Sequence, residues 1–314
     1  MGKKRATRRT SSRSDKVARK ASAAFQESRY RQKLQLELAG AADCSAIHDA
    51  VLTILREVGV IIEHLPTRKA LIKHHGCREG RDGFLRMSPD LVNRCIDSVP
   101  DAIQLYDLNG ECRVDTRLNL SSFCPGHNCV RILDHRTGEL RACRLEDIRE
   151  VARVCEQLPN IDMVCSLGYP SDIPAEDEVV ETVRAMMENA TKPAAMLAHD
   201  EHIQQRMMEV VSSIAGGWSQ LADKPVSLEL MGPISPLKLP DELCARLINC
   251  ARWRVPVVCY PATFPGMSSP ITAAGAIAQS SAEALAGIVV HQLSEPGAPV
   301  MSGSAILPMD MRQA

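Results

Sequence analysis

Four of the ten aromatic side chains in this chain of 314 residues lie at or just after the ends of apolar, strand-like runs: Phe123, Tyr169, Tyr260 and Phe264. The face of an aromatic ring attracts a cation that cannot donate hydrogen bonds, because the ring quadrupole is negative there. A carboxylate strengthens such a site, and Glu229 is the only acidic residue inside an apolar strand run. Burying a carboxylate is costly unless it is paired or functional. These residues indicate a pocket for a quaternary or tertiary ammonium group; loop packing of the rings and an ion-paired or outward-turned Glu229 are the alternatives.

A histidine and two cysteines within six residues, Cys124, His127 and Cys129, raise the alternative of a soft metal site. The spacing C-x-x-H-x-C matches no common zinc site and would need a remote fourth ligand, so we predict no metal. His127 stays a candidate for the pocket. His199, at the end of another strand-like run, is either a polar pocket residue or a structural histidine. The nucleophile pattern G-x-S-x-G and the zinc-binding pattern H-E-x-x-H do not occur in the sequence.

These candidates need elements that bring them to one place. After Arg144 the chain alternates between helical stretches and buried apolar runs, whose starts are between 30 and 43 residues apart. Each gap contains a helical stretch, so neighbouring runs are predicted to be parallel strands. The predicted strands are Asp162–Gly168, Pro193–Ala198, Val226–Met231, Pro256–Tyr260 and Pro299–Gly303.

Two architectures accept this alternation, an open doubly wound sheet and an eight-stranded (β/α) barrel. The open sheet usually binds a nucleotide through a glycine-rich first turn, and neither G-x-G-x-x-G nor the P-loop pattern occurs. We therefore predict an α/β fold of the TIM-type (β/α)8 barrel class, whose reactive groups lie at the carboxyl ends of the strands. With Leu118–Phe123 counted as a strand, six strands do not close such a barrel. We expect the barrel, residues 118–314, to be incomplete and to lack its last strands.

Residues 39–117 are predicted to form a cap of helices and short β-ribbons. Apolar residues at helical spacing predict a helix over Ala39–Val58, and further helices are expected through Arg68–His74 and from Ser88 onward. Short strands are expected at Ile103–Asp107 and Val130–Leu133. Residues 1–38 are predicted to be a basic, disordered arm, since nine basic residues and one acidic residue lie within residues 1–20.

The overall composition excludes several classes of protein. With 37 Lys and Arg against 38 Asp and Glu, the net charge is -1, so a body that wraps nucleic acid is not expected. The basic arm leaves a salt-sensitive nucleic-acid contact as a minor alternative. Twelve cysteines are spread along the chain without a Cys-x-x-Cys pair, which is typical of free thiols in a reducing cytoplasm. The long apolar stretch Ile271–Leu293 contains Glu283 and several polar residues, so we predict a buried helix and no membrane span.

Several short motifs follow one another in a characteristic order from about Ala39 to the end of the chain. They include Ile54-Leu55-Arg56-Glu57-Val58-Gly59-Val60, Thr191-Lys192-Pro193, Gly232-Pro233-Ile234-Ser235-Pro236-Leu237, Gly266–Ala276, Ala282–Gly287, Pro296–Val300 and Met309–Arg312. On these motifs the chain resembles the trimethylamine-corrinoid methyltransferase family. The part from Ser268 to Val300 is the most specific.

The resemblance implies a (β/α) barrel that moves a methyl group from a tertiary or quaternary methylamine to the Co(I) corrinoid of a separate protein. It implies that this chain binds no cofactor itself, and that its partners are the corrinoid protein and a small methylated amine; a homo-oligomer is compatible with it. Aromatic strand ends suit this task, because the substrate has to be positioned and kept from water. We expect the pocket or the corrinoid face to be lined by Phe123, His127, Tyr169, Glu229, Tyr260, Phe264 and Asp310.

The sequence also departs from the family pattern. Family members continue beyond Met309–Arg312, some of them with pyrrolysine in the later region, whereas this sequence ends at Ala314. The family's usual Asn before Pro-Ile-Ser-Pro is Gly232, and its glycine-rich turn after the first barrel strand is Pro125–Cys129. Either change is expected to alter the choice of substrate. The alternative function is a non-catalytic, truncated barrel fragment that only binds a partner.

Overall fold

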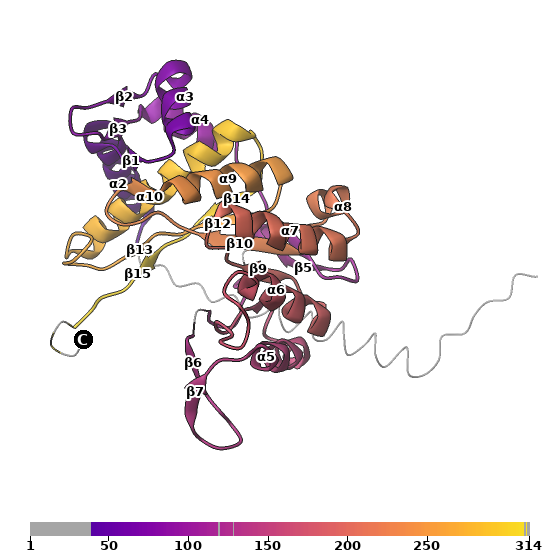
Figure 1. The fold of residues 1–314 in the computed structure, drawn as a ribbon. Helices are drawn as coiled ribbons and strands as arrows, with labels where there is room; N and C mark the ends of the chain where they lie inside the picture. Colours follow the sequence, from indigo (N-terminus) through magenta and orange to yellow (C-terminus); the bar gives the residue numbers. More distant parts are fainter. Residues whose placement is uncertain (1–38, 119, 128, 311, 313–314) are drawn as a thin grey trace, which may run out of the picture. The chain divides into compact units, whose positions relative to one another are not determined.

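The computed structural model describes residues 39–118, 120–127, 129–310 and 312 (Figure 1). Ala39–Ala314 group into one unit, so the boundary predicted between a cap and a barrel at residues 117 and 118 stays a prediction. The basic arm predicted for residues 1–38 lies outside the described residues.

The first part of the unit consists of short helices and β-ribbons. Ser88 caps the third helix, because its hydroxyl accepts a hydrogen bond from the Leu91 N–H (3.3 Å). Gly59 follows a π-helical turn in a left-handed conformation (φ 87°), where a side chain would collide with the Leu85 carbonyl. The elements are α2 (Ala41–Thr53), the π-helical turn (Ile54–Val58), β1 (Ile61–Ile62), α3 (Leu65–His75), β2 (Arg78–Glu79), β3 (Leu85–Arg86) and α4 (Pro89–Asp97). The three helices predicted in this region are confirmed.

Five parallel strands form the main sheet, in the order β14-β12-β10-β9-β8 (Figure 1). They are β8 (Val164–Cys165), β9 (Ala194–Met196), β10 (Ser227–Met231), β12 (Val257–Cys259) and β14 (Val300–Ser302). Each lies within one of the five predicted runs, so the prediction of parallel strands is confirmed. Helix α5 (Leu145–Gln157) precedes the first of them, and the helices between them are α6 (Glu178–Asn189), α7 (Glu201–Ala215), α8 (Trp218–Asp223), α9 (Asp241–Trp253) and α10 (Ala273–Ser294).

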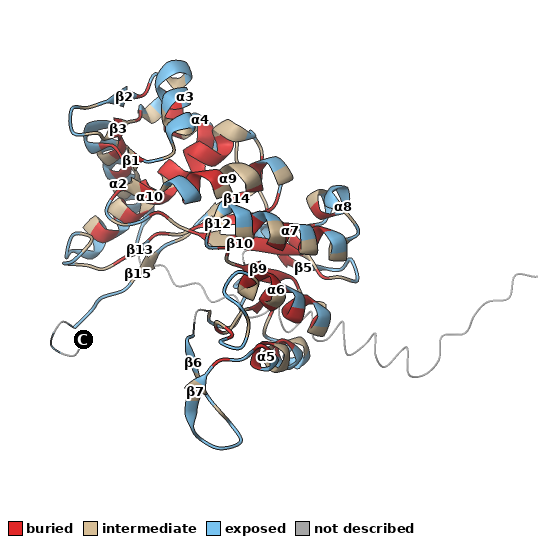
Figure 2. Cartoon of the chain, viewed as in Figure 1, coloured by how far each residue is buried: buried red, intermediate tan, exposed pale blue. Residues whose placement is uncertain are grey.

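The two faces of the sheet pack against different partners, because successive side chains along a strand alternate between faces. Met196 and Cys259 belong to the large apolar core that the sheet shares with the helices, and Figure 2 shows the buried helix sides in red. Cys165 and Leu228 belong to a smaller core on the opposite face. There the hairpin of β4 (Gln104–Tyr106) and β5 (Cys112–Asp115) contributes Leu105 and is hydrogen-bonded to the residue before Val226. This hairpin covers the amino end of that face.

The additional strand predicted at Leu118–Phe123 is wrong. Leu118 ends a 3-10 turn, and the described residues from there to Phe123 are not in a strand. The chain instead pairs with the β8 segment at Phe123 and again at Cys129. The Asp162 N–H donates to the Phe123 carbonyl (2.8 Å), and Cys129 bridges to Gly168, both at an offset of 39 residues. The segment parallel to β8 therefore begins at Phe123, where the predicted strand was expected to end. It reaches its carboxyl end six residues later, at Cys129. The antiparallel hairpin β6 (Arg131–Leu133) and β7 (Leu140–Ala142) follows it.

Two short parallel strands continue the sheet past its carboxyl edge. β13 (Ala262–Thr263) pairs with β15 (Ala305–Ile306) at the offset of 43 residues that also relates β12 to β14. Ile234 bridges to Ala262 beside them, and β11 (Lys238–Leu239) pairs with β1. Within the described residues the sheet ends at β14 on one side and at the segment beside β8 on the other, so no closed barrel is formed among them. The α/β fold class is confirmed at this level.

Helix α10 meets the length and composition expected of a membrane span, but 61% of its most apolar window is buried inside the protein. It packs against α2, α4, α9 and β14. Glu283 and His291, both within α10, are fully buried. The helix is therefore the buried helix that the sequence predicts, and packing explains its apolar composition.

Candidate functional site

Four rings lie near one another at the carboxyl end of the sheet. Tyr260 directly follows β12, and its hydroxyl lies 3.5 Å from Nε2 of His127, with the ring centroids 6.4 Å apart. Tyr169 comes after β8, and its ring centroid is 5.7 Å from that of His199, which comes after β9. Tyr169 lies near enough to Tyr260 to contribute to the raised pKa of its hydroxyl, so the two pairs share one region of the site. These four residues, His127, Tyr169, His199 and Tyr260, are the ring cluster.

Burial sets the ionisation of the two tyrosines of the ring cluster and of a nearby thiol. It raises the pKa of Tyr169 and of Tyr260 above the usual value, so both phenols are neutral. It also raises the pKa of Cys165 to about 12, so this thiol is no nucleophile at neutral pH. Nδ1 of His127 is buried and lacks a hydrogen-bond partner among the described residues. Neutral phenol rings such as those of Tyr169 and Tyr260 can hold a cation against their faces.

Glycines allow the strands to approach closely at the ring cluster. A Cβ at Gly232, just after β10, would lie 2.0 Å from the carbonyl oxygen of Tyr260. A Cβ at Gly303, just after β14, would lie 2.9 Å from the Tyr260 Cβ. Tyr260 is thus flanked by glycine on both neighbouring strands. A residue with a side chain at position 232 would not fit this backbone.

Glu229 lies away from the ring cluster. It is fully buried in β10, with its side chain on the face that packs against the helices. Its carboxyl accepts hydrogen bonds from the Gln204 amide (2.5 Å) and the Cys250 thiol (3.1 Å), and lies 3.5 Å from the Arg246 guanidinium. Burial raises the pKa of Glu229, and Arg246 opposes this shift. This placement corresponds to the ion-paired alternative considered from the sequence.

A different carboxylate lies beside the ring cluster. Glu178 is the first residue of α6, and it lines a small cavity with Ser166, Tyr169 and Thr182, between α6 and the strands β8 and β9. Burial raises the pKa of Glu178, and His199 opposes the shift. The sequence did not single out this residue, because acidic residues at 176, 177 and 181 surround it. The one signal is that Glu178 begins the helix that follows β8, because the start of such a helix lies near the carboxyl edge of the sheet.

The other sequence candidates lie elsewhere. Phe123 is 58% exposed and lies beside the amino end of β8, opposite to the end that Tyr169 follows. Phe264 is half-buried in a turn after β13, and Asp310 is exposed beyond β15. The structure thus brings together three of the seven predicted site residues: His127, Tyr169 and Tyr260.

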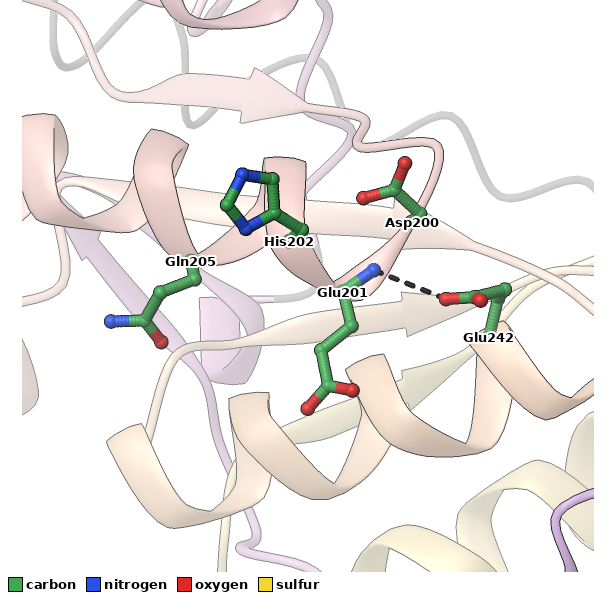
Figure 3. A pocket seen from close by; sticks show the side chains of 5 residues that line it. All are labelled: Asp200, Glu201, His202, Gln205 and Glu242. Atoms are coloured by element: carbon green, nitrogen blue, oxygen red, sulfur yellow. Dashed lines mark hydrogen bonds between the residues drawn. The ribbon is translucent and has the colours of Figure 1, made fainter.

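Acidic side chains do not converge on a metal-binding arrangement in the part of the chain that the structure describes. An acidic surface hollow of about 550 Å³ lies at the start of α7, next to α9 (Figure 3). Asp200 caps α7 by accepting the Ile203 N–H (2.7 Å), and Glu242 accepts the Glu201 N–H (3.2 Å). Figure 3 shows these carboxylates pointing in different directions. Helix capping accounts for them.

Exposed apolar side chains gather where the sheet continues beyond its carboxyl edge. Ile234 beside β13 is 56% exposed, and Met267 in the turn after β13 is 57% exposed. Leu307 follows β15, and its N–H donates to the Thr263 carbonyl (2.9 Å). Apolar surface next to a ligand-binding edge is typical of a contact with another molecule.

The fold and the site together define an α/β protein whose candidate ligand-binding groups lie at the carboxyl edge of a parallel sheet. The model of one protein family, described as trimethylamine methyltransferase (MTTB), matches residues 5–314. The chain therefore belongs to the trimethylamine methyltransferase family, and the resemblance found in the sequence motifs is confirmed.

Curated relatives agree with this family. The trimethylamine methyltransferase MttB of Desulfitobacterium hafniense is 27% identical over 88% of this chain and 56% of its own length. MttB of Methanosarcina barkeri is 26% identical over 89% of this chain and 58% of its own length. A glycine betaine methyltransferase of D. hafniense is 26% identical over 85% and 55%. The chain thus spans just over half the length of these relatives. The crystal structure of the hydroxylamine MtmB complex aligns with a TM-score of 0.49 and 10% identity over 93% of this chain and 59% of that chain.

Proposed function

We propose that this protein transfers a methyl group from a tertiary or quaternary methylamine to the corrinoid of a separate partner protein. In this proposal the parallel sheet is part of a (β/α)8 barrel. The observation that carries it is the ring cluster, which lies at the carboxyl edge of the sheet in a chain of the trimethylamine methyltransferase family. The relatives, named as trimethylamine and glycine betaine methyltransferases, share a methylated ammonium group as the reacting part of the substrate.

The side chains of the ring cluster suit this substrate. A methylated ammonium group carries a positive charge on an apolar surface and offers few or no hydrogen-bond donors, so aromatic faces bind it well. A quaternary substrate already carries the charge that makes the amine a leaving group. The protein therefore needs to fix the direction of one N–CH3 bond and to keep water away. Tyr169 and Tyr260, neutral and partly buried, can do both.

The apolar surface beyond the carboxyl edge fits a partner that presents a corrinoid. A corrin ring is broad, flat and largely apolar at its rim, and Ile234, Met267 and Leu307 offer exposed apolar contacts where the sheet continues beyond its carboxyl edge. The reduced corrinoid supplies the nucleophile for the methyl group. In this arrangement the chain supplies only the surface and the substrate pocket and binds no cofactor of its own.

Methyl transfer to free cob(I)alamin tests this function with the full chain. Trimethylamine, tetramethylammonium and glycine betaine are supplied in turn, and formation of methylcobalamin and of the demethylated amine is measured. We expect Tyr260→Ala to lower the rate about tenfold, the order of a lost cation–aromatic contact, while Tyr260→Phe keeps most of it.

Unfolding of both Tyr260 variants is followed in parallel, so that a loss of rate is separated from a loss of structure. Equal rates for the wild type and Tyr260→Ala would exclude the ring cluster as the substrate site. Absence of methylcobalamin with all three amines, both with free cobalamin and with corrinoid proteins, would exclude the proposed activity.

A further inference from the structure

The carboxylate of Glu178 lacks a counterion of its own. Within the described residues it takes part in no hydrogen bond or ion pair, and His199 is the one cationic or ionisable base that acts on it. Arg206 of α7, the helix that packs against α6, is bound to the Asp177 carboxylate and the Glu176 carbonyl. A half-buried carboxylate in this state is costly unless a ligand supplies the positive charge.

The cavity beside Glu178 contains a second unsatisfied polar group. Thr182 is 6% exposed, and its Oγ1 lacks a hydrogen-bond partner among the described residues. Thr182 lies one helical turn after Glu178 on the same side of α6, and both line the cavity with Tyr169. Ser166 also lines the cavity, but its hydroxyl donates to the Gly168 carbonyl (2.6 Å), and the remaining lining is apolar, from Val179, Val183, Met186 and the side of β9. Its enclosed part has room for about 20 Å³, the size of one water molecule or one methyl group.

We propose that Glu178 is the anionic side chain that recognises the methylated ammonium group of the substrate, at the mouth of this cavity. The cation lies between the Glu178 carboxylate and the Tyr169 ring, and one methyl group points into the cavity. This inference rests on the proposed function, and it assigns the role expected for Glu229 to a residue on a different element. It also sets specificity, because the same carboxylate repels a carboxylate on the ligand.

Binding of tetramethylammonium chloride to the full chain tests the proposal without any methyl transfer. Isothermal titration calorimetry at constant ionic strength compares the wild type with Glu178→Gln, which keeps the shape of the side chain and removes its charge. We expect Glu178→Gln to bind about tenfold more weakly, the order expected for one partly screened charge pair. Glu178→Asp keeps the charge and is expected to bind more tightly than Glu178→Gln.

Glu188→Gln is the matched control. Glu188 lies on the same helix, is exposed, and is ten residues away, or about 15 Å along α6, so its removal changes the net charge equally without touching the cavity. We expect this variant to bind like the wild type.

A second ligand, glycine betaine, distinguishes a loss of charge recognition from a general loosening of the structure. The wild type is expected to prefer tetramethylammonium, and Glu178→Gln to narrow that preference, whereas a structural defect would weaken both ligands alike.

The outcomes separate this inference from the proposed function. Wild-type affinity in Glu178→Gln, equal weakening in Glu188→Gln, or no binding of tetramethylammonium by the wild type would each overturn the role of Glu178. Methyl transfer that persists at the wild-type rate in Glu178→Gln would overturn that role and leave the proposed function standing. If binding of tetramethylammonium depends on Glu178 but the protein transfers no methyl group, the cation site is supported and the proposed function is excluded.

Discussion

Glu178 lines the candidate cavity and Glu229 does not, because the Glu229 side chain lies on the face of β10 that packs against the helices. Glu229 lies in a strand whose apolar residues run on both faces, since Leu228 and Leu230 face the smaller core and Met231 faces the helices. A strand buried on both faces shows no alternation in its sequence, so its pattern does not reveal which face a polar residue occupies. The sequence could therefore show that Glu229 lies in a core strand. It could not show whether the Glu229 side chain faces the pocket or the helices.

Removal of the Glu229 carboxyl is expected to act on stability first. Glu229→Ala leaves the Gln204 amide, the Cys250 thiol and the Arg246 guanidinium around a cavity, which should cost about 3 kcal/mol. Glu229→Gln keeps the shape and an acceptor and should cost less. Urea unfolding of both variants at neutral pH measures the difference.

The effect of pH on Glu229 has a definite sign. Because its pKa is raised in the folded state, the folded protein holds this proton more tightly than the unfolded chain. The wild type therefore loses stability as pH rises from the unfolded pKa to the folded one, and Glu229→Gln does not. We expect the stability deficit of Glu229→Gln to shrink between pH 4 and neutral pH. A deficit that stays constant over this range would mean that the pKa of Glu229 is not raised.

Among the elements, the strands and helices with strong periodic patterns could be predicted, and the irregular segment beside β8 could not. Leu118–Phe123 reads as a strand because Leu118 and Leu120 alternate with polar residues, but the described residues that pair with the β8 segment are Phe123 and Cys129. The residues between them include Pro125 and Gly126, which give no strand signal. The shift matters for function, because it brings His127 and not Phe123 to the carboxyl edge.

The anchor of this segment can be tested at Asp162. The Asp162 carboxylate accepts the Phe123 N–H (2.8 Å), while the Asp162 N–H donates to the Phe123 carbonyl (2.8 Å). Asp162→Ala leaves the part-buried Phe123 N–H without this acceptor and should cost about 1 kcal/mol. Asp162→Asn keeps an acceptor and serves as the control. We expect faster hydrogen exchange in residues 120–129 for Asp162→Ala alone; unchanged exchange there would show that the segment is held by other contacts.

In the unit as a whole, α10 links the cap region to the sheet, since it packs against α2, α4, α9 and β14. Its buried polar groups fall into two kinds. Glu283 accepts hydrogen bonds from the Ser235 hydroxyl (2.5 Å) and the Leu237 N–H (2.9 Å), and so fixes the loop after β10. His291 is fully buried, and its Nε2 lacks a partner among the described residues. The composition of α10 predicts that the helix is buried. It does not predict which groups surround Glu283 and His291, because those groups come from residues distant in the sequence.

Acid should destabilise the whole unit through His291. Burial lowers the pKa of His291 from 6.5 to about 4, so the folded protein keeps the ring neutral while the unfolded chain takes up a proton. Stability is therefore lost as pH falls from 6.5 towards 4, by about 3 kcal/mol at most for this single group. Over the same fall Glu229 acts in the opposite direction, because its raised pKa favours the folded state in acid. We expect His291→Gln, which cannot titrate, to lose less stability than the wild type between pH 7 and pH 4.5. The paired rings of Trp218 and Trp253, 5.3 Å apart, provide a fluorescence signal for unfolding in urea. If His291→Gln and the wild type lose the same stability over this range, His291 is not held neutral in the folded protein, and the acid sensitivity has to come from other groups.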